Sequence, residues 1–384
     1  MKKWLKNIPD GTNDILFSKC KIKKQTERKL ENYFDKIGYS QIITPGIEFF
    51  DVFYSPEIFD AQAMYKLFDN KNRLLALRAD CTTPVARVAA TRLKDCEGPL
   101  KLFYNQSVFR SNTDFEGKRN EVTQCGCELI GISGIKADID IIATAAGALS
   151  AAGIENYKIE IGHVGLFKAL AEESELNEDD TEIVRELIEN KNLTALESFV
   201  ESKGEKTENL LKLAKLFGGF EVLEKAKKYF TSFPAQMIIS YIQELAYSLS
   251  QIGLKDKIFI DLGLVSSINY YTGIVFKGYT EGLGNVVLSG GRYDGLLQKF
   301  GTDRPAAGFA IDVDALVDTF KNDIEDSCDC IIFYKGGNEK QAYELLNEKI
   351  QNGVRCQISA FSTLEETEEY ANANNISQVL EIGE

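Results

Sequence analysis

Side chains that could hold a small charged ligand gather in residues 100–131, LKLFYNQSVFRSNTDFEGKRNEVTQCGCELIG. We predict two β-strands here, joined by a charged loop. Successive side chains of a strand point to opposite faces, so Gln124, Gly126 and Glu128 share one face, which is polar. At the rise of a strand, Gln124 and Glu128 are about 13 Å apart, and Gly126 between them has no side chain. We therefore expect an open floor with room for a small ligand.

The first strand of the hairpin contributes an arginine, Arg110, near these polar side chains. Tyr104, Gln106 and Arg110 alternate along it, which places the Arg110 guanidinium where the strand meets the loop. A guanidinium binds a carboxylate through two hydrogen bonds, and a carboxylate such as that of Glu128 binds an ammonium. The pair suits a zwitterion. An antiparallel sheet with one solvent-facing side also carries polar residues without any ligand, and the hairpin alone leaves both interpretations open.

The hairpin resembles motif 2 of class II aminoacyl-tRNA synthetases, and Gln124-x-Gly126-x-Glu128 after Phe109-Arg110 is similar to the histidyl-tRNA synthetase version. Other stretches that resemble this family follow in its order: a strand containing Pro45 that is similar to motif 1, LRADCTTP at 77–84, LVSSINYYTGIVF at 264–276, SGGRYDGLL at 289–297 and GFAIDVDAL at 308–316. The resemblance covers nearly the whole chain. It implies an α+β fold in which helices flank an antiparallel class II sheet.

Length and composition are those of a globular protein with two or three domains. The chain has 384 residues, of which 44% are hydrophobic and 27% charged. Its formal net charge of -14 is unfavourable for a nucleic-acid partner, because binding to phosphates depends on Lys and Arg. The eight cysteines are scattered, and the single histidine, His163, is far from both Cys-x-Cys pairs. We therefore expect reduced structural thiols, a structural histidine, no metal site and no cofactor.

No apolar run approaches the roughly 18 residues of a membrane span. The basic start, MKKWLK, is followed by IPDGTNDIL and not by the apolar segment of a signal peptide. We expect a cytoplasmic protein with no membrane partner.

The elements that position the hairpin can be placed from spacing and breakers. Apolar spacing of three and four predicts a helix over 18–37 that ends at Gly38. The strand that contains Pro45 is expected at an edge or an interface, because proline cannot donate a ladder hydrogen bond. Its resemblance to motif 1 implies a self-dimer through this region. A helix is predicted after Asp80, with Pro84 in its first turn. Either Asp80 or Thr82 caps this helix, or, as the resemblance implies, Asp80 faces the pocket for a substrate ammonium.

The pattern divides the chain into four parts. Residues 1–164 and 252–322 are expected to form the first and second parts of the class II synthetase-like domain, and the charged, helical pattern of 165–251 predicts an insertion. Residues 323–384 alternate strand and helix, and they resemble a truncated anticodon-binding domain of histidyl-tRNA synthetases. From Lys321 onward the chain has five basic and thirteen acidic side chains, a balance that repels a tRNA backbone.

The resemblance breaks at positions that carry positive charge. A synthetase needs fixed cations to hold the ATP phosphates and to stabilise charge on the α-phosphate. Where the family has arginine, this sequence has Ser266 in LVSSINYY and Ala315 in GFAIDVDAL. In the hairpin loop Asn112 replaces a glutamate and Asn120 an arginine, although Lys118 keeps one positive charge. Losing one electrostatic donor costs roughly 10²–10³ in rate, so we expect negligible adenylation and no catalytic residue.

The positions that match belong to the family's amino-acid pocket. We expect L-histidine to bind there through Asp80, Thr82, Arg110, Gln124, Glu128, Tyr270 and Tyr271. In the roles that the resemblance implies, Glu128 and Asp80 hold the ammonium and Arg110 holds the carboxylate. The other four side chains position and enclose the imidazole.

A histidine pocket without adenylation resembles the regulatory subunits of short-form ATP phosphoribosyltransferase, a family related to histidyl-tRNA synthetases. The resemblance implies a non-catalytic chain of L-histidine biosynthesis, needed for activity of a small catalytic subunit and for feedback inhibition by histidine. It also implies a hetero-octamer of four catalytic and four regulatory chains, with no tRNA partner. Two alternatives stay open: a divergent, active histidyl-tRNA synthetase, and a protein-interaction module with no ligand.

Overall fold

The computed structural model describes residues 4–54, 61–112, 119–265, 270–281, 284, 286–320 and 328–383. The chain divides into two compact units, Met1–Ile15 with Ile22–Lys321 and Leu16–Lys21 with Asn322–Glu384. The larger unit contains a nine-stranded and a three-stranded sheet, and the smaller unit contains a further three-stranded sheet.

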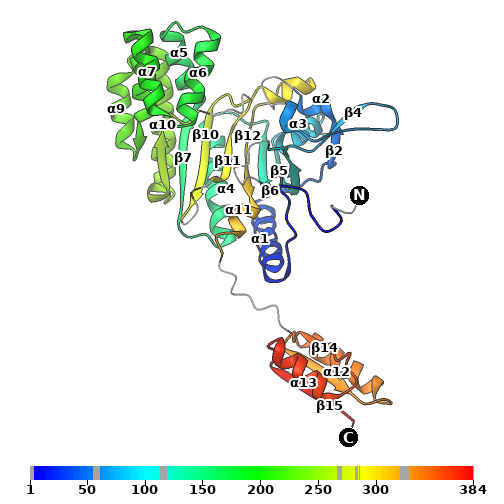
Figure 1. Ribbon diagram of the computed structural model, residues 1–384. Coiled ribbons are helices and arrows are strands. Elements are labelled where there is room, and N and C mark those ends of the chain that lie inside the picture. The colour runs from blue at the N-terminus through cyan, green and yellow to red at the C-terminus, as the bar shows by residue number, and fades with distance from the viewer. Residues whose placement is uncertain are drawn as a thin grey trace. The chain divides into compact units, whose positions relative to one another are not determined.

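The nine-stranded sheet is built around the predicted hairpin, β5 and β6 (Figure 1). Its strands lie in the order β1-β5-β6-β12-β11-β10-β7-β9-β8. Each neighbouring pair from β5 to β7 is antiparallel, whereas β1 pairs with β5, and β7 with β9, in parallel. In sheet order the strands are β1 (Ser40–Gln41), β5 (Leu100–Phe109), β6 (Glu121–Ile130), β12 (Ala306–Asp312), β11 (Val286–Arg292), β10 (Ile274–Thr280), β7 (Tyr157–His163), β9 (Ile258–Asp261) and β8 (Phe217–Gly218).

Two helices cover one face of this sheet (Figure 1): α1 (Phe17–Lys36) and α4 (Ile135–Ala152). The ring of Phe34 in α1 is fully buried. It lies 5.7 Å from the ring of Phe103 in β5 and 6.0 Å from that of Phe309 in β12. Because β5 and β12 flank β6, this aromatic contact fixes α1 against the sheet behind β6.

The other face of the hairpin meets shorter elements, α3 (Thr82–Thr91) and the 3-10 helix η4 (Leu296–Phe300). Their apolar side chains form one buried cluster with the sheet, to which α3 gives Val85 and Ala86, η4 gives Leu296 and Leu297, and the hairpin gives Leu102 and Ile130. The chain before α3 forms the small antiparallel sheet and its helices: β2 (Ile47–Phe49), α2 (Phe50–Phe53), η1 (Ala61–Ala63), β3 (Lys66–Phe68) and β4 (Leu74–Leu77). A short helix, α11 (Val313–Val317), follows β12.

A helical module lies at the β7 end of the sheet (Figure 1). Its elements are α5 (Val164–Glu173), α6 (Glu178–Glu189), α7 (Leu193–Lys203), η2 (Glu205–Thr207), α8 (Glu208–Lys215), α9 (Glu221–Tyr229) and α10 (Phe233–Gln251), followed by η3 (Lys255–Lys257). The longest helix of this module, α10, buries Ile239, Ile242 and Leu249 on its inner side. The two-residue strand β8 pairs with β9 at the sheet edge, and the charged helical pattern of this region does not predict it.

The smaller unit is the parallel sheet β14-β13-β15 with two helices. Its elements are β13 (Cys330–Tyr334), α12 (Glu339–Gln351), β14 (Cys356–Ile358), α13 (Leu364–Ala373) and β15 (Gln378–Ile382). Helix α13 begins with a capping box, in which the side chains of Thr363 and Glu366 each accept the backbone N–H of the other. The α+β fold class is confirmed, and the division of the chain into four parts stays a prediction.

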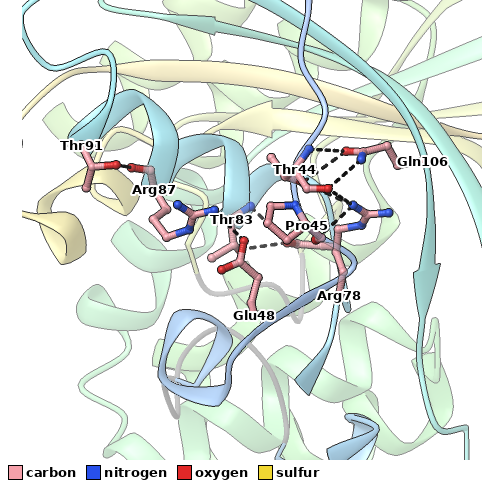
Figure 2. A network of polar contacts seen from close by, with 9 residues as sticks. Thr44, Pro45, Glu48, Arg78, Thr83, Arg87, Thr91 and Gln106 are labelled. Carbon is pink, nitrogen blue, oxygen red and sulfur yellow. Dashed lines mark hydrogen bonds and ion pairs between the residues drawn. The ribbon is translucent and has the colours of Figure 1, made fainter. Parts of the chain in front are cut away.

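A buried arginine ties the segment around Pro45 to the hairpin (Figure 2). Arg78 donates from Nε and Nη2 to the carbonyl oxygen of Ser107, at 3.0 and 2.7 Å. Its Nη1 donates to the carbonyl oxygens of Thr44 and Pro45, at 2.8 and 3.2 Å. Gln106 Nε2 donates to Thr44 O at 2.9 Å. Three segments of the chain thus converge on one guanidinium, whose donors are satisfied by backbone carbonyls.

Replacing Arg78 by methionine should lower the free energy of unfolding by about 3 kcal/mol, because each buried carbonyl left without a donor costs about 1–3 kcal/mol. The matched control is Arg73→Met, which removes an exposed ion pair with Asp69 of a kind that contributes at most about 1 kcal/mol. Urea unfolding followed by circular dichroism measures both variants. Equal losses in the two would show that the Arg78 guanidinium does not hold this segment.

Candidate functional site

The carboxylate of Glu128 lies at the centre of the site, on β6, with 0% of the residue exposed. Three hydroxyls from three segments donate to it. Thr82 Oγ1 donates to Oε1 at 2.7 Å, Tyr104 OH donates to Oε1 at 3.2 Å, and Tyr293 OH donates to Oε2. Burial raises the pKa of Glu128 to about 8, although the three hydroxyl bonds favour the charged form. The site therefore holds a carboxyl group that ionises only near neutral pH.

Glycine makes room for this carboxyl group on the neighbouring strand. A Cβ at Gly308, which is in register with Glu128 across β12 and β6, would lie 1.7 Å from Glu128 Oε2. At Gly126 the expected open floor is absent. A Cβ there would lie 2.1 Å from Phe309 O and 2.7 Å from Tyr104 OH, because the neighbouring strand and the tyrosine approach the backbone closely.

Asp80 lies one residue before Cys81, the N-cap of α3, and makes a cap-like contact with the first turn of the helix. Its Oδ1 accepts from Thr83 N and its Oδ2 from Thr83 Oγ1, both at 3.1 Å. Burial raises the pKa of this carboxyl, and the bonds from Thr83 and the charge of Arg110 oppose the rise. The capping contact starts α3 and so places Thr82 against Glu128. The role of Asp80 as a ligand group stays a prediction.

Arg110 and the two predicted tyrosines lie near Asp80, and the tyrosines also lie near Glu128. Arg110 Nε donates to Ala79 O at 2.9 Å, just after β5. The rings of Tyr270 and Tyr271 meet edge to face at 4.9 Å. Burial raises the pKa of both hydroxyls, and the Glu128 charge adds to the rise. The tyrosines thus form an apolar wall beside the buried acid.

Gln124 lies further along β6, in register with Gln106 of β5 and Asp312 of β12. Its Oε1 is buried and has no hydrogen-bond partner among the residues that the structure describes. A buried acceptor without a donor costs about 1–3 kcal/mol. A ligand N–H that donated to this oxygen would recover that energy.

Tyr293 is a site residue that the sequence reasoning did not select. Its hydroxyl donates to Glu128, and its ring lies 5.7 Å from that of Tyr270 at an interplanar angle of 71°. It follows the Gly290-Gly291 pair in SGGRYDGLL, a stretch that the sequence analysis used only for its resemblance to the synthetase family. The feature that could have identified Tyr293 was its position: it is an aromatic residue at the end of a strand, inside a stretch that resembles the synthetase family.

The positions where the synthetase family carries cations hold other groups here. Ala315 N donates to Asp312 Oδ1 at 2.8 Å at the start of α11. Asp314 Oδ1 accepts from Lys23 Nζ at 2.6 Å, and its Oδ2 accepts from Thr123 N at 2.7 Å. A methyl group and two carboxylates therefore occupy this corner of the sheet.

At the base of the hairpin loop, Asn112 and Asn120 hold one another. Asn112 Nδ2 donates to Asn120 Oδ1 at 3.1 Å and to Arg119 O at 2.9 Å. These neutral amides close the loop without a charge. The other two positions of this comparison, Ser266 and Lys118, lie outside the described residues.

The single histidine caps a helix. His163 Nδ1 accepts from Gly165 N at 3.1 Å, and burial lowers the pKa of the imidazole to about 4. Within the described part of the chain, no three His, Cys, Asp or Glu side chains are placed to hold a metal ion. The described helices also include none that is both long and apolar enough to span a membrane.

Comparisons with known proteins agree on one family. A family profile described as histidyl-tRNA synthetase matches residues 11–316. The chain is 42% identical to the ATP phosphoribosyltransferase regulatory subunit of Clostridium botulinum strain Langeland, over 99% of this chain and 92% of the relative. It is 41% identical to the protein of the same name from Clostridium acetobutylicum, over 97% and 94%.

Two solved structures share the fold. A crystal structure described as an ATP phosphoribosyltransferase regulatory subunit/histidyl-tRNA synthetase from Bacillus halodurans matches with a TM-score of 0.90 and 32% identity, over 99% of each chain. Histidyl-tRNA synthetase from Nostoc sp. PCC 7120 matches with a TM-score of 0.79 and 20% identity, over 97% of this chain and 90% of that one. The second likeness shows the class II synthetase fold alone.

The pKa of Glu128 predicts how stability depends on pH. Since the folded pKa of about 8 exceeds the ordinary value of 4.5, the folded chain binds more protons than the unfolded chain between these values. Its contribution to stability therefore falls as pH rises from 4.5 to 8, by up to about 1.4 kcal/mol per pH unit. Glu128→Gln removes this dependence. Urea unfolding at several pH values should therefore show that the free energy of unfolding of the variant rises relative to that of the wild type as pH increases.

The control for this prediction is Glu121→Gln, an exposed position on the same strand, which should track the wild type at every pH. A difference between Glu128→Gln and wild type that is constant from pH 5 to pH 8 would contradict the raised pKa.

Proposed function

The chain belongs to the family of ATP phosphoribosyltransferase regulatory subunits, which are similar to histidyl-tRNA synthetases, and we propose that it binds L-histidine in the Glu128 pocket to regulate a catalytic partner. It is a non-catalytic chain of histidine biosynthesis. Through the pocket, it makes the catalytic subunit of ATP phosphoribosyltransferase both active and sensitive to feedback inhibition by histidine.

The observation that carries the proposal is a fully buried carboxylate held by hydroxyls. An ionised acid in such a place is costly unless a cation pairs with it. The ammonium of an amino acid supplies that cation at Glu128. The Arg110 guanidinium, at the end of β5, suits the carboxylate of the same ligand. The open acceptor of Gln124 suits an N–H of the side chain, which an imidazole has.

Adenylation is not supported, because the transfer of a nucleotide needs fixed positive charge around the phosphates. The end of β12 presents Asp312 and, after it, the methyl group of Ala315, and the Lys23 ammonium there is already paired with Asp314 at 2.6 Å. The alternative of a divergent histidyl-tRNA synthetase is tested directly by pyrophosphate exchange with ATP and histidine, and measurable turnover would replace the present proposal.

The partner proposals extend this function. We place the chain in a hetero-octamer of four catalytic and four regulatory subunits in the cytoplasm, with no tRNA and no membrane partner. Self-dimerisation through the region around Pro45 is supported by exposed apolar side chains there, of which Ile43 is 80% and Ile47 is 48% exposed. The acidic balance beyond Lys321 is unfavourable for tRNA.

Isothermal titration calorimetry should show one L-histidine bound per chain, with affinity that rises about tenfold per pH unit up to about pH 8. The reason is that the ammonium binds the ionised form of Glu128, so each binding event below pH 8 releases a proton. Glu128→Gln should weaken binding at least about 100-fold, since it removes a buried charge pair. Glu121→Gln should bind as the wild type does.

Unchanged affinity in a double variant, Arg110→Ala with Glu128→Ala, would remove histidine from this pocket. Absence of any binding in the wild type would favour the ligand-free interaction module.

Co-purification with the catalytic subunit should yield a complex of four and four chains by light scattering, active without histidine and inhibited by it. Ile43→Glu should disrupt self-association, because it puts a charge on the exposed apolar region. Ile183→Glu, an equivalent change at an exposed apolar position of α6, should leave the assembly intact. A catalytic subunit that is as active alone as in the complex would contradict the regulatory role.

A further inference from the structure

A second buried network begins next to the pocket. Arg292, the last residue of β11, precedes Tyr293 and is 6% exposed. Its Nε and Nη2 donate to Asp138 Oδ1 at 2.9 and 2.5 Å. Asp138 lies in the first turn of α4 and is 1% exposed. Its other oxygen, Oδ2, accepts the hydroxyl of Tyr241, which comes from the middle of α10. The network therefore joins the strand that presents Tyr293 to a helix of the helical module.

The backbone around Tyr293 is held from both sides. Thr272 N donates to Arg292 O at 2.7 Å, and Asp294 N donates to Thr272 Oγ1 at 3.0 Å. Asp294 Oδ1 accepts from Arg292 Nη1 and from Ala306 N, both at 3.0 Å. Thr272 follows Tyr271 of the pocket wall. Because these bonds link neighbouring residues into one unit, Tyr293 shifts only together with Arg292.

Tyr241 is the member of the network that belongs to the helical module. Its ring meets the imidazole of His163 edge to face at 6.1 Å, at the junction of β7 and α5. The outer face of α10 exposes apolar side chains that include Phe233, Met237 and Tyr247. The network thus connects the segment that carries Tyr293 with α10, a helix whose other side is open to solvent.

We propose that Arg292, Asp138 and Tyr241 are positioning residues that hold Tyr293 against Glu128 and make α10 the helix of the module that responds to the ligand. This inference rests on the proposed function, since it concerns the effect of histidine in the same pocket. When the ligand ammonium pairs with Glu128, the carboxyl group changes its charge and its bond from Tyr293 changes with it. The constraint on Tyr293 passes through the Arg292–Asp138 pair to the hydroxyl of Tyr241, so ligand binding orders α10.

A conservative substitution can remove one hydrogen bond of the Arg292–Asp138–Tyr241 network without unfolding the chain. Removing Asp138 or Arg292 would leave a buried charge without its partner, which destabilises the whole fold. Tyr241→Phe removes only the hydroxyl and keeps the ring against His163. Tyr247→Phe makes the same chemical change on the same helix, at a residue that is 65% exposed. The two variants form a matched pair.

The test is hydrogen exchange of the full chain with and without saturating L-histidine, read by mass spectrometry over peptides of α10. In the wild type and in Tyr247→Phe, histidine should slow exchange of α10 amides at least fivefold. In Tyr241→Phe the slowing should be lost. Calorimetry should show histidine bound to this variant about two- to fivefold more weakly, since Tyr293 is held less firmly. A thermal midpoint close to that of the wild type confirms that the variant folds.

If Tyr241→Phe binds histidine and keeps the full slowing in α10, the inference is overturned. It is also overturned if the wild type binds histidine with no change in α10. Neither result affects the proposed ligand. If calorimetry shows no histidine bound to the wild type, the proposed function itself fails, and this inference fails with it. If Tyr241→Phe does not fold, the wild-type measurement decides, because histidine that binds without slowing the exchange of α10 amides overturns the inference.

Discussion

The burial of one carboxyl group constrains the whole site. Glu128 lies on β6, between two antiparallel neighbours, β5 and β12, and is out of contact with solvent, so its oxygens need donors. Those donors come from α3, β5 and the segment after β11, each of which must approach the same point. The glycine at 308 is required because any side chain there would overlap the carboxylate. Three local features accommodate this buried carboxyl group: the contact of Asp80 with the start of α3, the close approach of backbone and tyrosine at Gly126, and the edge-to-face packing of the tyrosines.

Buried charge in this protein is handled in two ways, and the difference separates structure from function. Arg78 is surrounded by backbone carbonyls, and Arg292 is paired with Asp138. In both places the folded chain supplies the compensating groups, as expected of charges that hold elements together. Glu128 has only neutral donors, so the folded chain keeps it protonated up to about pH 8. A group that the fold leaves uncompensated is ready for a ligand of opposite charge.

The hairpin and its polar face could be predicted from the sequence, because strand alternation is a local property. Alternation correctly placed Gln124 and Glu128 on one side of β6. It could not show that Glu128 would be fully buried or that the space at Gly126 would be filled, since both depend on the register between β6 and β12, which are far apart in sequence. Tyr293 was missed for the same reason. The capping role of Asp80 could be foreseen as an alternative, because a cap is defined within four residues. Strand β8 has only two residues and forms by pairing with β9, so no local pattern reveals it.

Under the proposed function, the site keeps the amino-acid half of a synthetase pocket without its phosphate half, and such a site can do one thing well. A synthetase uses the binding energy of its amino acid to drive a reaction with ATP, and its ligand is consumed. Ala315 and the carboxylates of Asp312 and Asp314 lie at the end of β12, and under the proposed function an amino acid bound beside Glu128 meets no activated phosphate. It stays in equilibrium with the solution, and the occupancy of the pocket then depends only on ligand concentration and pH. Reversible occupancy is the property that a sensor needs and an adenylating enzyme must avoid, because a sensor acts through differences in population between bound and free states. The same losses that end catalysis thus make the pocket suitable for regulation, provided that some element outside it is tied to Glu128 and its partners.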